Sequence, residues 1–426
     1  MTKNDKKELQ LNHVARLFFL RFKVGISKIM ENYWLKACVI LYWVLVLGIT
    51  AQYHPADTVH RLLWGLGLPL VLAGAAALFV LAVILLATPK EAAAMSRDLR
   101  RAGVTNAAGE APILLNLDKL PNGRAVATLV SRGVSISQYS DMAERIETAW
   151  NRRITRIETG PERNTVRIYL APGDAVIPQR ADWDDVYLDK RDFAFTLGIC
   201  LDGLYSVDLN VAPHVLIAGS TGSGKTVLIK NIIHQALKKG AEVYLIDLKG
   251  GLDYPEDWKN RDCSFCAEQQ SALSLLAQAV EELERRKIIL AQHHSPNIEV
   301  YRREHDGSLA HILIVLDEIA ELTDTTGLDK EHKEMVHTTI ALLSTLARMG
   351  RAYGIHLLVG TQRPDANILP GQIKNNCDVR ICGRADNTLS IIILDNADAA
   401  DKIPKDSRGR FLTNDGTEFQ GFWMPM

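Results

Sequence analysis

The feature of this sequence that most constrains its fold is Leu62–Ala87, a run of apolar residues without a charged side chain. As a helix this run would be about 39 Å long, which exceeds the roughly 30 Å hydrocarbon core of a lipid bilayer. A second apolar run, Ala37–Ala51, precedes it after a short polar loop. We therefore predict a transmembrane hairpin over residues 33–88, with spans at about 33–51 and 62–87.

Basic residues flank the predicted hairpin on both sides. Lysines and arginines precede the first span and follow the second, whereas the loop between the spans carries only Arg61. The positive-inside rule then predicts a two-span protein of the cell membrane with both termini in the cytoplasm. The basic cytoplasmic N-terminal segment, residues 1–32, would be either an amphipathic helix on an anionic membrane surface or a tail. A signal peptide would have a single short apolar core, so we expect the hairpin to remain in the mature chain.

The composition of the whole chain is that of a globular protein. Hydrophobic residues make up 47% and charged residues 23%, which excludes a mainly disordered chain. The net charge of −1 excludes a generally polybasic protein, so any nucleic-acid-binding surface must be local. We expect residues 89–196 to form a small α+β cytosolic domain. Within it, residues 142–156 have helical spacing, and the arginines near the end of that helix would face solvent or contact DNA.

A glycine-rich loop between an apolar strand and a helix carries the clearest chemical signal. The residues after His214 read VLIAGSTGSGKTVLIKNII and satisfy the P-loop pattern G-x-x-x-x-G-K-[ST]. Such a loop points successive backbone N–H groups at a phosphate, while its lysine reaches the β- and γ-phosphates and its hydroxyl binds Mg²⁺. The predicted ATP-binding residues are Gly219, Ser220, Thr221, Gly222, Ser223, Gly224, Lys225 and Thr226.

Two apolar strands later in the sequence are each followed by polar residues. HILIVLDEIAEL places Asp317 and Glu318 after a strand, and GIHLLVGTQRP ends at Gln362. In a mainly parallel sheet these ends meet at the carboxyl edge, where ligands collect. We predict that Asp317 holds Mg²⁺, through water or together with Thr226, and that Glu318 is the general base for water. Gln362 would be a sensor that contacts the γ-phosphate or the attacking water.

At this point the sequence resembles a known family. PHVLIAGSTGSGKT, LIDLKG, EELERRKIIL, ILIVLDEIAEL, ARMGRAYGIHLLVGTQRP and the later IKNN and ILD occur in the order and spacing of the FtsK/SpoIIIE DNA translocases. The resemblance covers about residues 197–422, and we assign residues 197–426 to the motor domain. It implies a RecA-like, ATP- and Mg²⁺-dependent α/β motor that is anchored in the membrane, forms a homohexameric ring and moves double-stranded DNA irrespective of sequence.

Three departures separate this chain from the chromosomal translocases of that family. It has two predicted spans where those have more, it has no long linker, and it reaches Met426 directly after the motor, so we expect no winged-helix module. The compact arrangement looks more like the FtsK-like coupling proteins of Gram-positive integrative and conjugative elements, which implies a relaxase and secretion-channel proteins as partners. A chromosome-segregating translocase and the ATPase of a protein-export system remain alternatives.

The resemblance also predicts an arginine that completes the active site of a neighbouring subunit. In the family this arginine lies just before the I-L-D that corresponds to Ile393–Asp395, where this chain has Ser390, Ile391 and Ile392. An isoleucine cannot stabilise charge on a phosphoryl group. Either the ring hydrolyses ATP without such an arginine, or another arginine takes over this catalytic role, for which Arg384, a few residues away, is the candidate.

Overall fold

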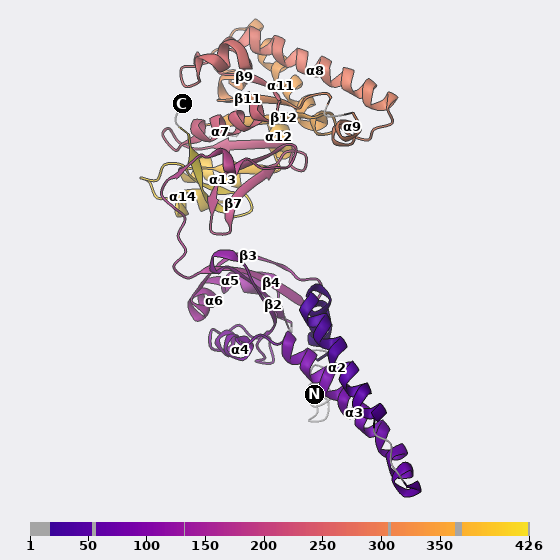
Figure 1. The fold of residues 1–426 in the computed structure, drawn as a ribbon. Coiled ribbons are helices and arrows are strands. Elements are labelled where there is room, and N and C mark those ends of the chain that lie inside the picture. Colours follow the sequence, from indigo (N-terminus) through magenta and orange to yellow (C-terminus); the bar gives the residue numbers. More distant parts are fainter. Residues whose placement is uncertain (1–17, 53–56, 132, 306–307, 363–368, 425–426) are drawn as a thin grey trace. The chain divides into compact units, whose positions relative to one another are not determined.

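The computed structural model describes residues 18–52, 57–131, 133–305, 308–362 and 369–424. Two compact units divide the chain: Met1–Ala175 and Val176–Met426. The fold class predicted from the sequence is confirmed in both units: two apolar helices and a small α+β domain precede an α/β P-loop domain. Each unit is described separately below (Figure 1).

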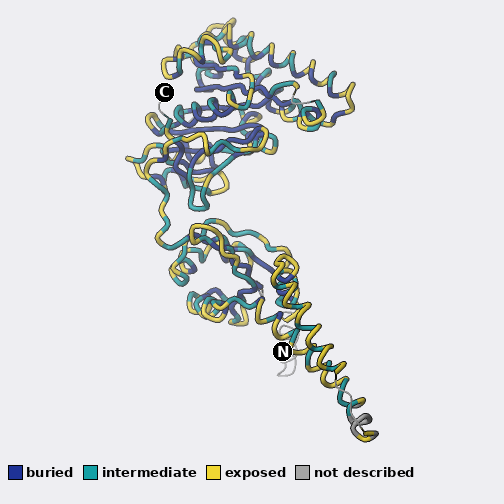
Figure 2. The backbone as a smooth tube through the Cα atoms, viewed as in Figure 1, coloured by how far each residue is buried: buried dark blue, intermediate teal, exposed yellow. Residues whose placement is uncertain are grey.

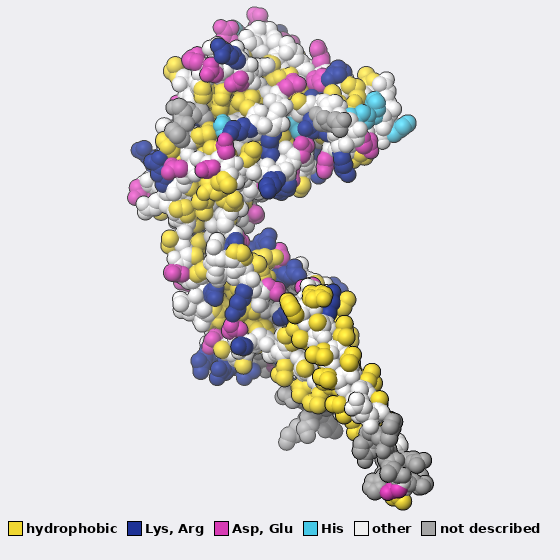
Figure 3. Space-filling model, viewed as in Figure 1, with side chains coloured by type: hydrophobic (Ala, Val, Ile, Leu, Met, Phe, Trp, Pro, Cys, Tyr) yellow, Lys and Arg dark blue, Asp and Glu magenta, His cyan; other side chains and the backbone are white. Residues whose placement is uncertain are grey.

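Two long apolar helices, α2 (Tyr33–Gln52) and α3 (Thr58–Ala87), form the hairpin of the first unit. The Tyr42 hydroxyl donates to the carbonyl of Ala75 at 2.7 Å, and the Tyr42 ring stacks on Phe79. On the face shown in Figure 3, hydrophobic side chains cover much of the described part of the hairpin. Residues 33–52 and 67–87 are long and apolar enough to cross a membrane, with mean hydropathies of 1.9 and 3.0.

The described part of the basic N-terminal segment is a helix over residues 18–31. It crosses α3 closely, because a Cβ added at Gly25 would lie 2.4 Å from the carbonyl oxygen of Val83. At its start, Leu20 packs with Leu115 and Val130 of the following domain. The sequence left a membrane-surface helix and a tail as alternatives, and residues 18–31 are helical and packed on the protein. Residues 1–17 lie outside the described residues.

The small domain is a four-stranded antiparallel sheet in the order β1-β2-β4-β3 with helices against it. Its core joins Leu99 and Ile146 from the helices to Leu114, Leu129 and Ile168 from the sheet. The elements are α4 (Ala92–Arg101), β1 (Ile113–Lys119), the 3-10 turn η1 (Pro121–Gly123), β2 (Ala125–Val130), α5 (Ile136–Asp141), α6 (Ala143–Trp150), β3 (Arg152–Thr159) and β4 (Thr165–Pro172).

One sequence-based expectation in this domain is wrong. Residues 142–156 were predicted to form one helix, but α6 ends at Trp150 and β3 begins at Arg152. Asn151 between them has a φ of 48°, a left-handed conformation that ends a helix. The arginines of RRITRIET therefore lie on a strand paired with β4 rather than on a helix face.

The boundary between the two units also differs from the expected one. From the sequence we expected it between residues 196 and 197, whereas the second unit begins at Val176. The physical reason is antiparallel pairing: β6 (Ala194–Cys200) runs through the expected boundary and pairs with β7 (Gly203–Asp208) and with β15 (Glu418–Trp423). Residues 176–196 therefore belong with the motor.

The motor sheet combines a parallel and an antiparallel half. Its strand order is β10-β9-β11-β12-β8-β13-β14-β15-β6-β7, and the pairs from β10 to β13 are parallel. β5 (Ala181–Asp182) pairs with β15 at the side. The remaining strands are β8 (His214–Ala218), β9 (Glu242–Ile246), β10 (Cys263–Cys266), β11 (Ile312–Leu316), β12 (Ile355–Thr361), β13 (Val379–Cys382) and β14 (Arg410–Thr413).

Helices cover both faces of the parallel half, so its strands are buried on both sides (Figure 2). In Figure 1, α8 and α11 lie on one side of β9, β11 and β12, and α7 lies on the other. The helices are α7 (Lys225–Lys238), α8 (Gln269–Gln292), α9 (Ile298–Glu304), α10 (Ala320–Thr323), α11 (Lys330–Tyr353), α12 (Gly371–Asn376), α13 (Asn387–Leu394) and α14 (Asp398–Lys402), with short turns η2 (Asp185–Tyr187) and η3 (Trp258–Asp262). This arrangement brings the carboxyl ends of β8, β11 and β12 to one edge.

Candidate functional site

The P-loop lies at the carboxyl end of β8, and α7 begins at Lys225 directly after it. Gly224 has a φ of 101°, which L-residues with a side chain rarely adopt. A Cβ at this position would also lie 3.0 Å from the Cα of Gly409, which precedes β14. The loop therefore curls tightly against a segment from the end of the chain, and glycine is required where the two backbones meet.

Lys225 is buried at this edge, with 4% of its surface exposed. Its ammonium donates to the backbone carbonyl of Asp317 and lies 3.3 Å from the carboxylate oxygen Oδ1 of the same residue. Gly360 of β12 makes room for this contact, because a Cβ there would lie 3.0 Å from the lysine Nζ and 2.2 Å from the Asp317 carbonyl oxygen. In this state the P-loop lysine uses Asp317 as its counter-charge.

Asp317 and Thr226 provide a pair of oxygen ligands suited to Mg²⁺. The Thr226 hydroxyl lies 3.5 Å from Oδ1 of Asp317, and the hydroxyl of the buried Tyr254 donates to the same oxygen at 3.0 Å. Mg²⁺ takes few protein oxygens and fills its remaining positions with water and phosphate, so this sparse donor set fits that ion. Burial raises the pKa of nearby Asp247, and the charge of Asp317 raises it further.

Glu318 is held by the end of β12. The Thr361 hydroxyl donates to one carboxylate oxygen at 3.0 Å, and the Gln362 backbone N–H donates to the other at 2.9 Å. Burial raises the pKa of Glu318, and the charge of Lys225 partly opposes that effect. A buried, oriented carboxylate with a raised pKa has the properties of a general base.

The structure brings most of the predicted site residues together around the P-loop. Gln362 accepts a hydrogen bond from the Thr221 hydroxyl at 2.9 Å, so the predicted sensor touches the loop. Ser223 Oγ, within the P-loop itself, is buried and has no hydrogen-bond partner among the described residues. Arg384 was predicted to act on a neighbouring subunit, but its guanidinium donates to the Thr221 carbonyl of its own chain at 2.7 Å.

Sequence reasoning missed three residues of this site. Tyr254 follows a glycine pair with no recognisable motif, and only the fold places its hydroxyl on Asp317. Thr361 ends a strand one residue before Gln362, yet its hydrogen bond to Glu318 depends on the pairing of two strands that are far apart in the sequence. Gly360 sits directly before the T-Q pair that marked the sensor, and a glycine inside an otherwise apolar strand was the available signal of a close approach.

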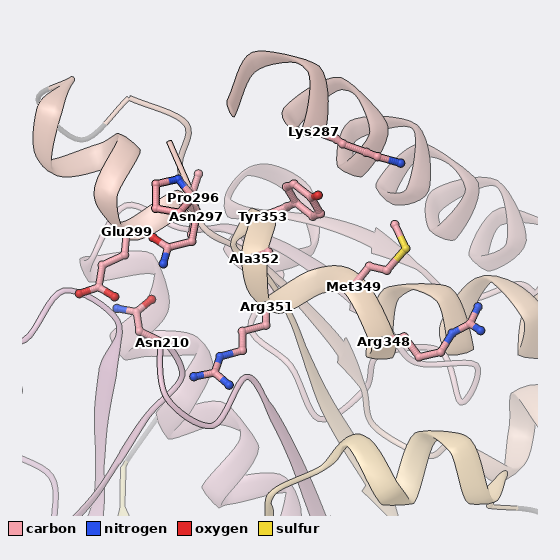
Figure 4. Close-up of a pocket in the computed structure, with 11 residues that line it drawn as sticks. Asn210, Lys287, Pro296, Asn297, Glu299, Arg348, Met349, Arg351, Ala352 and Tyr353 are labelled. Carbon is pink, nitrogen blue, oxygen red and sulfur yellow. The ribbon is translucent and has the colours of Figure 1, made fainter. Parts of the chain in front are cut away.

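A separate cavity lies at the opposite edge of the motor sheet, beside the end of α11 (Figure 4). It has a volume of about 620 Å³ and is lined by Asn210, Lys287, Pro296, Asn297, Ile298, Glu299, Arg348, Met349, Arg351, Ala352 and Tyr353. α11 leads into the amino end of β12, so this cavity is remote from the carboxyl edge that carries the P-loop.

The sequence of this chain matches known proteins over the same region. The model of the FtsK/SpoIIIE family matches residues 185–366. The DNA translocase FtsK of Staphylococcus epidermidis is 30% identical over 292 residues, which cover 64% of this chain and 35% of that protein. FtsK of Campylobacter jejuni is 34% identical over 218 residues, which cover 48% of this chain and 22% of that protein. The chain thus spans about a third or less of these relatives.

A solved structure covers more of the chain. The pCW3 conjugation coupling protein TcpA, in its monomer form with ATPγS, aligns with a TM-score of 0.57 and 35% sequence identity. The alignment covers 79% of this chain and 95% of TcpA. This extent, the family match across the P-loop and both acidic residues, and the geometry of the site lead to one assignment. The chain belongs to the FtsK/SpoIIIE family of P-loop ATPases and resembles the conjugation coupling protein TcpA.

Proposed function

We propose that this protein is a membrane-anchored, ATP-driven DNA translocase, and specifically a coupling protein that delivers DNA to a conjugative secretion channel. The observation that carries the proposal is the convergence of Lys225, Thr226, Asp317 and Glu318 at the carboxyl edge of the parallel strands. The likeness to a protein whose name is conjugation coupling protein supports the finer assignment.

The geometry gives each of these side chains a separate task. ATP would offer Lys225 a triphosphate in place of Asp317, so the lysine would exchange one anionic partner for another. That exchange would release the Asp317 carboxylate to hold Mg²⁺ together with the Thr226 hydroxyl. When bound, the ion would neutralise charge on the phosphates.

Glu318 would then take the proton from the attacking water. Its carboxylate is oriented by Thr361 and by the Gln362 backbone, and its raised pKa favours proton acceptance. The Gln362 backbone N–H donates to Glu318 and its side chain accepts from the Thr221 hydroxyl, so we expect the side-chain amide to respond to the terminal phosphate.

Membrane anchoring and assembly complete the proposal. The α2–α3 hairpin would span the cell membrane twice with both termini in the cytoplasm, which places the motor beside cellular ATP. A homohexameric ring would hold DNA through its phosphates irrespective of sequence, and a relaxase and channel proteins would be the partners.

Gly360→Ala should weaken nucleotide binding, because the added methyl group occupies space needed by Lys225 and by the Asp317 carbonyl. We expect the affinity for ATPγS to fall at least about tenfold, a loss comparable to one charged hydrogen bond. Gly371→Ala is the control, since a Cβ there meets no atom within 4 Å. Calorimetric titration of both folded variants measures the effect, and wild-type affinity in Gly360→Ala would contradict this account of the lysine.

DNA should stimulate ATP hydrolysis by the full-length protein in nanodiscs of zwitterionic lipid. We expect stimulation by duplexes of unrelated sequence and a steep loss of DNA affinity as salt rises from about 50 to 200 mM, because phosphate contacts release counterions. Phosphate release measured across a salt series tests both points. Stimulation by secreted polypeptides but not by DNA would instead favour a protein-export ATPase.

Single cysteines should reveal the topology of the hairpin. In a variant whose Cys38 is replaced by alanine, Asp57→Cys should react with a membrane-impermeant maleimide added to intact cells, because residue 57 lies between the two spans. Val176→Cys should react only after lysis, although Val176 is 81% exposed. The reverse labelling pattern would show that the motor faces away from cytoplasmic ATP.

A further inference from the structure

The Arg384 side chain makes two hydrogen bonds within its own chain, one to the P-loop and one to a segment later in the sequence. One guanidinium nitrogen, Nη2, donates to the Thr221 carbonyl at 2.7 Å. The other, Nη1, donates to the carbonyl of Lys405 at 2.6 Å. The backbone of Arg384 makes a third link, because its own carbonyl accepts from the Ser220 N–H at 2.8 Å. The residue therefore joins the P-loop to the segment that follows α14.

The segment of residues 403–409, hereafter the C-terminal segment, touches the P-loop at a second place. The Gly409 N–H donates to the Ser223 carbonyl at 2.8 Å, where the backbones of Gly409 and Gly224 meet. Ile403 anchors the start of the segment in the core. The P-loop is thus enclosed by residues that lie far beyond it in the sequence.

Thr221 connects these contacts of the P-loop to Glu318, the proposed general base. Its hydroxyl donates to the Gln362 side chain, and the Gln362 backbone donates to Glu318. A continuous path of hydrogen bonds therefore runs from the Glu318 carboxylate through Gln362 and Thr221 to Arg384 and the C-terminal segment.

The geometry of a phosphate-binding loop explains why such a tie is needed. When successive N–H groups point inward at an anion, the carbonyls of the same peptides point outward, and they require donors of their own. Arg384 supplies that donor at the apex of the loop, at Thr221. We propose that Arg384 acts in cis as a positioning residue that holds the P-loop apex against the C-terminal segment and thereby sets the affinity for nucleotide.

This role differs from the catalytic role predicted from the sequence. An arginine that stabilises charge in a neighbouring subunit contributes mainly to kcat, by about a thousandfold or more. An arginine that shapes the loop before the reaction contributes to ground-state binding, which appears in KM and in the affinity for a non-hydrolysed analogue. To reach another subunit, Arg384 would have to give up both carbonyls of its own chain.

The test compares Arg384→Ala and Arg384→Lys with wild type in the full-length protein. We expect Arg384→Ala to raise the ATPγS dissociation constant and the KM for ATP about tenfold, with kcat within about threefold. Arg384→Lys should recover part of the lost affinity, because an ammonium can still donate to a carbonyl. Arg380→Ala is the matched control: Arg380 lies on neighbouring β13 and pairs with Asp395 at 2.7 Å, so ATPγS affinity should be unchanged.

A mixing experiment separates the two roles. If Arg384 acts in cis, adding a Lys225→Ala variant to Arg384→Ala should not raise ATP turnover above that of Arg384→Ala alone, at either low or saturating ATP. A large fall in kcat with unchanged ATPγS affinity, together with recovery on mixing, would overturn the inference in favour of action between subunits. Unchanged ATPγS affinity and unchanged KM in both Arg384 variants would also overturn it. The inference rests on the proposed ATPase, yet ATPγS binding tests it separately: wild-type protein without ATP turnover would refute the proposed function alone.

Discussion

The buried contact between Lys225 and Asp317 is the interaction on which the rest of the site depends. An ammonium at 4% exposure is stable only with an anionic or carbonyl partner, and Asp317 supplies both a carbonyl and a carboxylate. The contact requires three adjacent parallel strands: β8 delivers the lysine through the P-loop, β11 delivers Asp317, and Gly360 on β12 leaves the space between them. The order of the strands in the sheet therefore determines which side chains meet at the site.

The same contact explains how binding of a nucleotide would reorganise the site. A triphosphate would compete with Asp317 for Lys225, and the carboxylate that it released would be the one beside Thr226 that we propose as a ligand of Mg²⁺. Tyr254, which lies on the loop after β9, donates a hydrogen bond to the same carboxylate oxygen. The exchange would therefore also change the contacts of that loop. Through Thr221 and Arg384, the nucleotide site is also connected to residues 403–409, just before the final strands.

Sequence reasoning succeeded where the signal was local. The apolar hairpin, the P-loop and the acids after β11 each lie within one short stretch, and their residue types carry the chemistry. It failed where the structure depends on a single backbone torsion or on a partner that lies far away in the sequence. Asn151 ends a helix by adopting a left-handed conformation, and β6 joins the motor because it pairs with β15, which is more than two hundred residues away. The closure of the P-loop by Gly409 could not be read from a motif for the same reason.

The central claim is that Lys225 and Glu318 serve binding and hydrolysis separately. Measuring ATPγS affinity and phosphate release for Lys225→Ala and Glu318→Gln tests it most directly. We predict that Glu318→Gln binds ATPγS like wild type but releases almost no phosphate, since only the base is lost. Lys225→Ala should bind weakly and hydrolyse nothing, because the phosphates lose their counter-charge. Substantial phosphate release by Glu318→Gln would contradict the account.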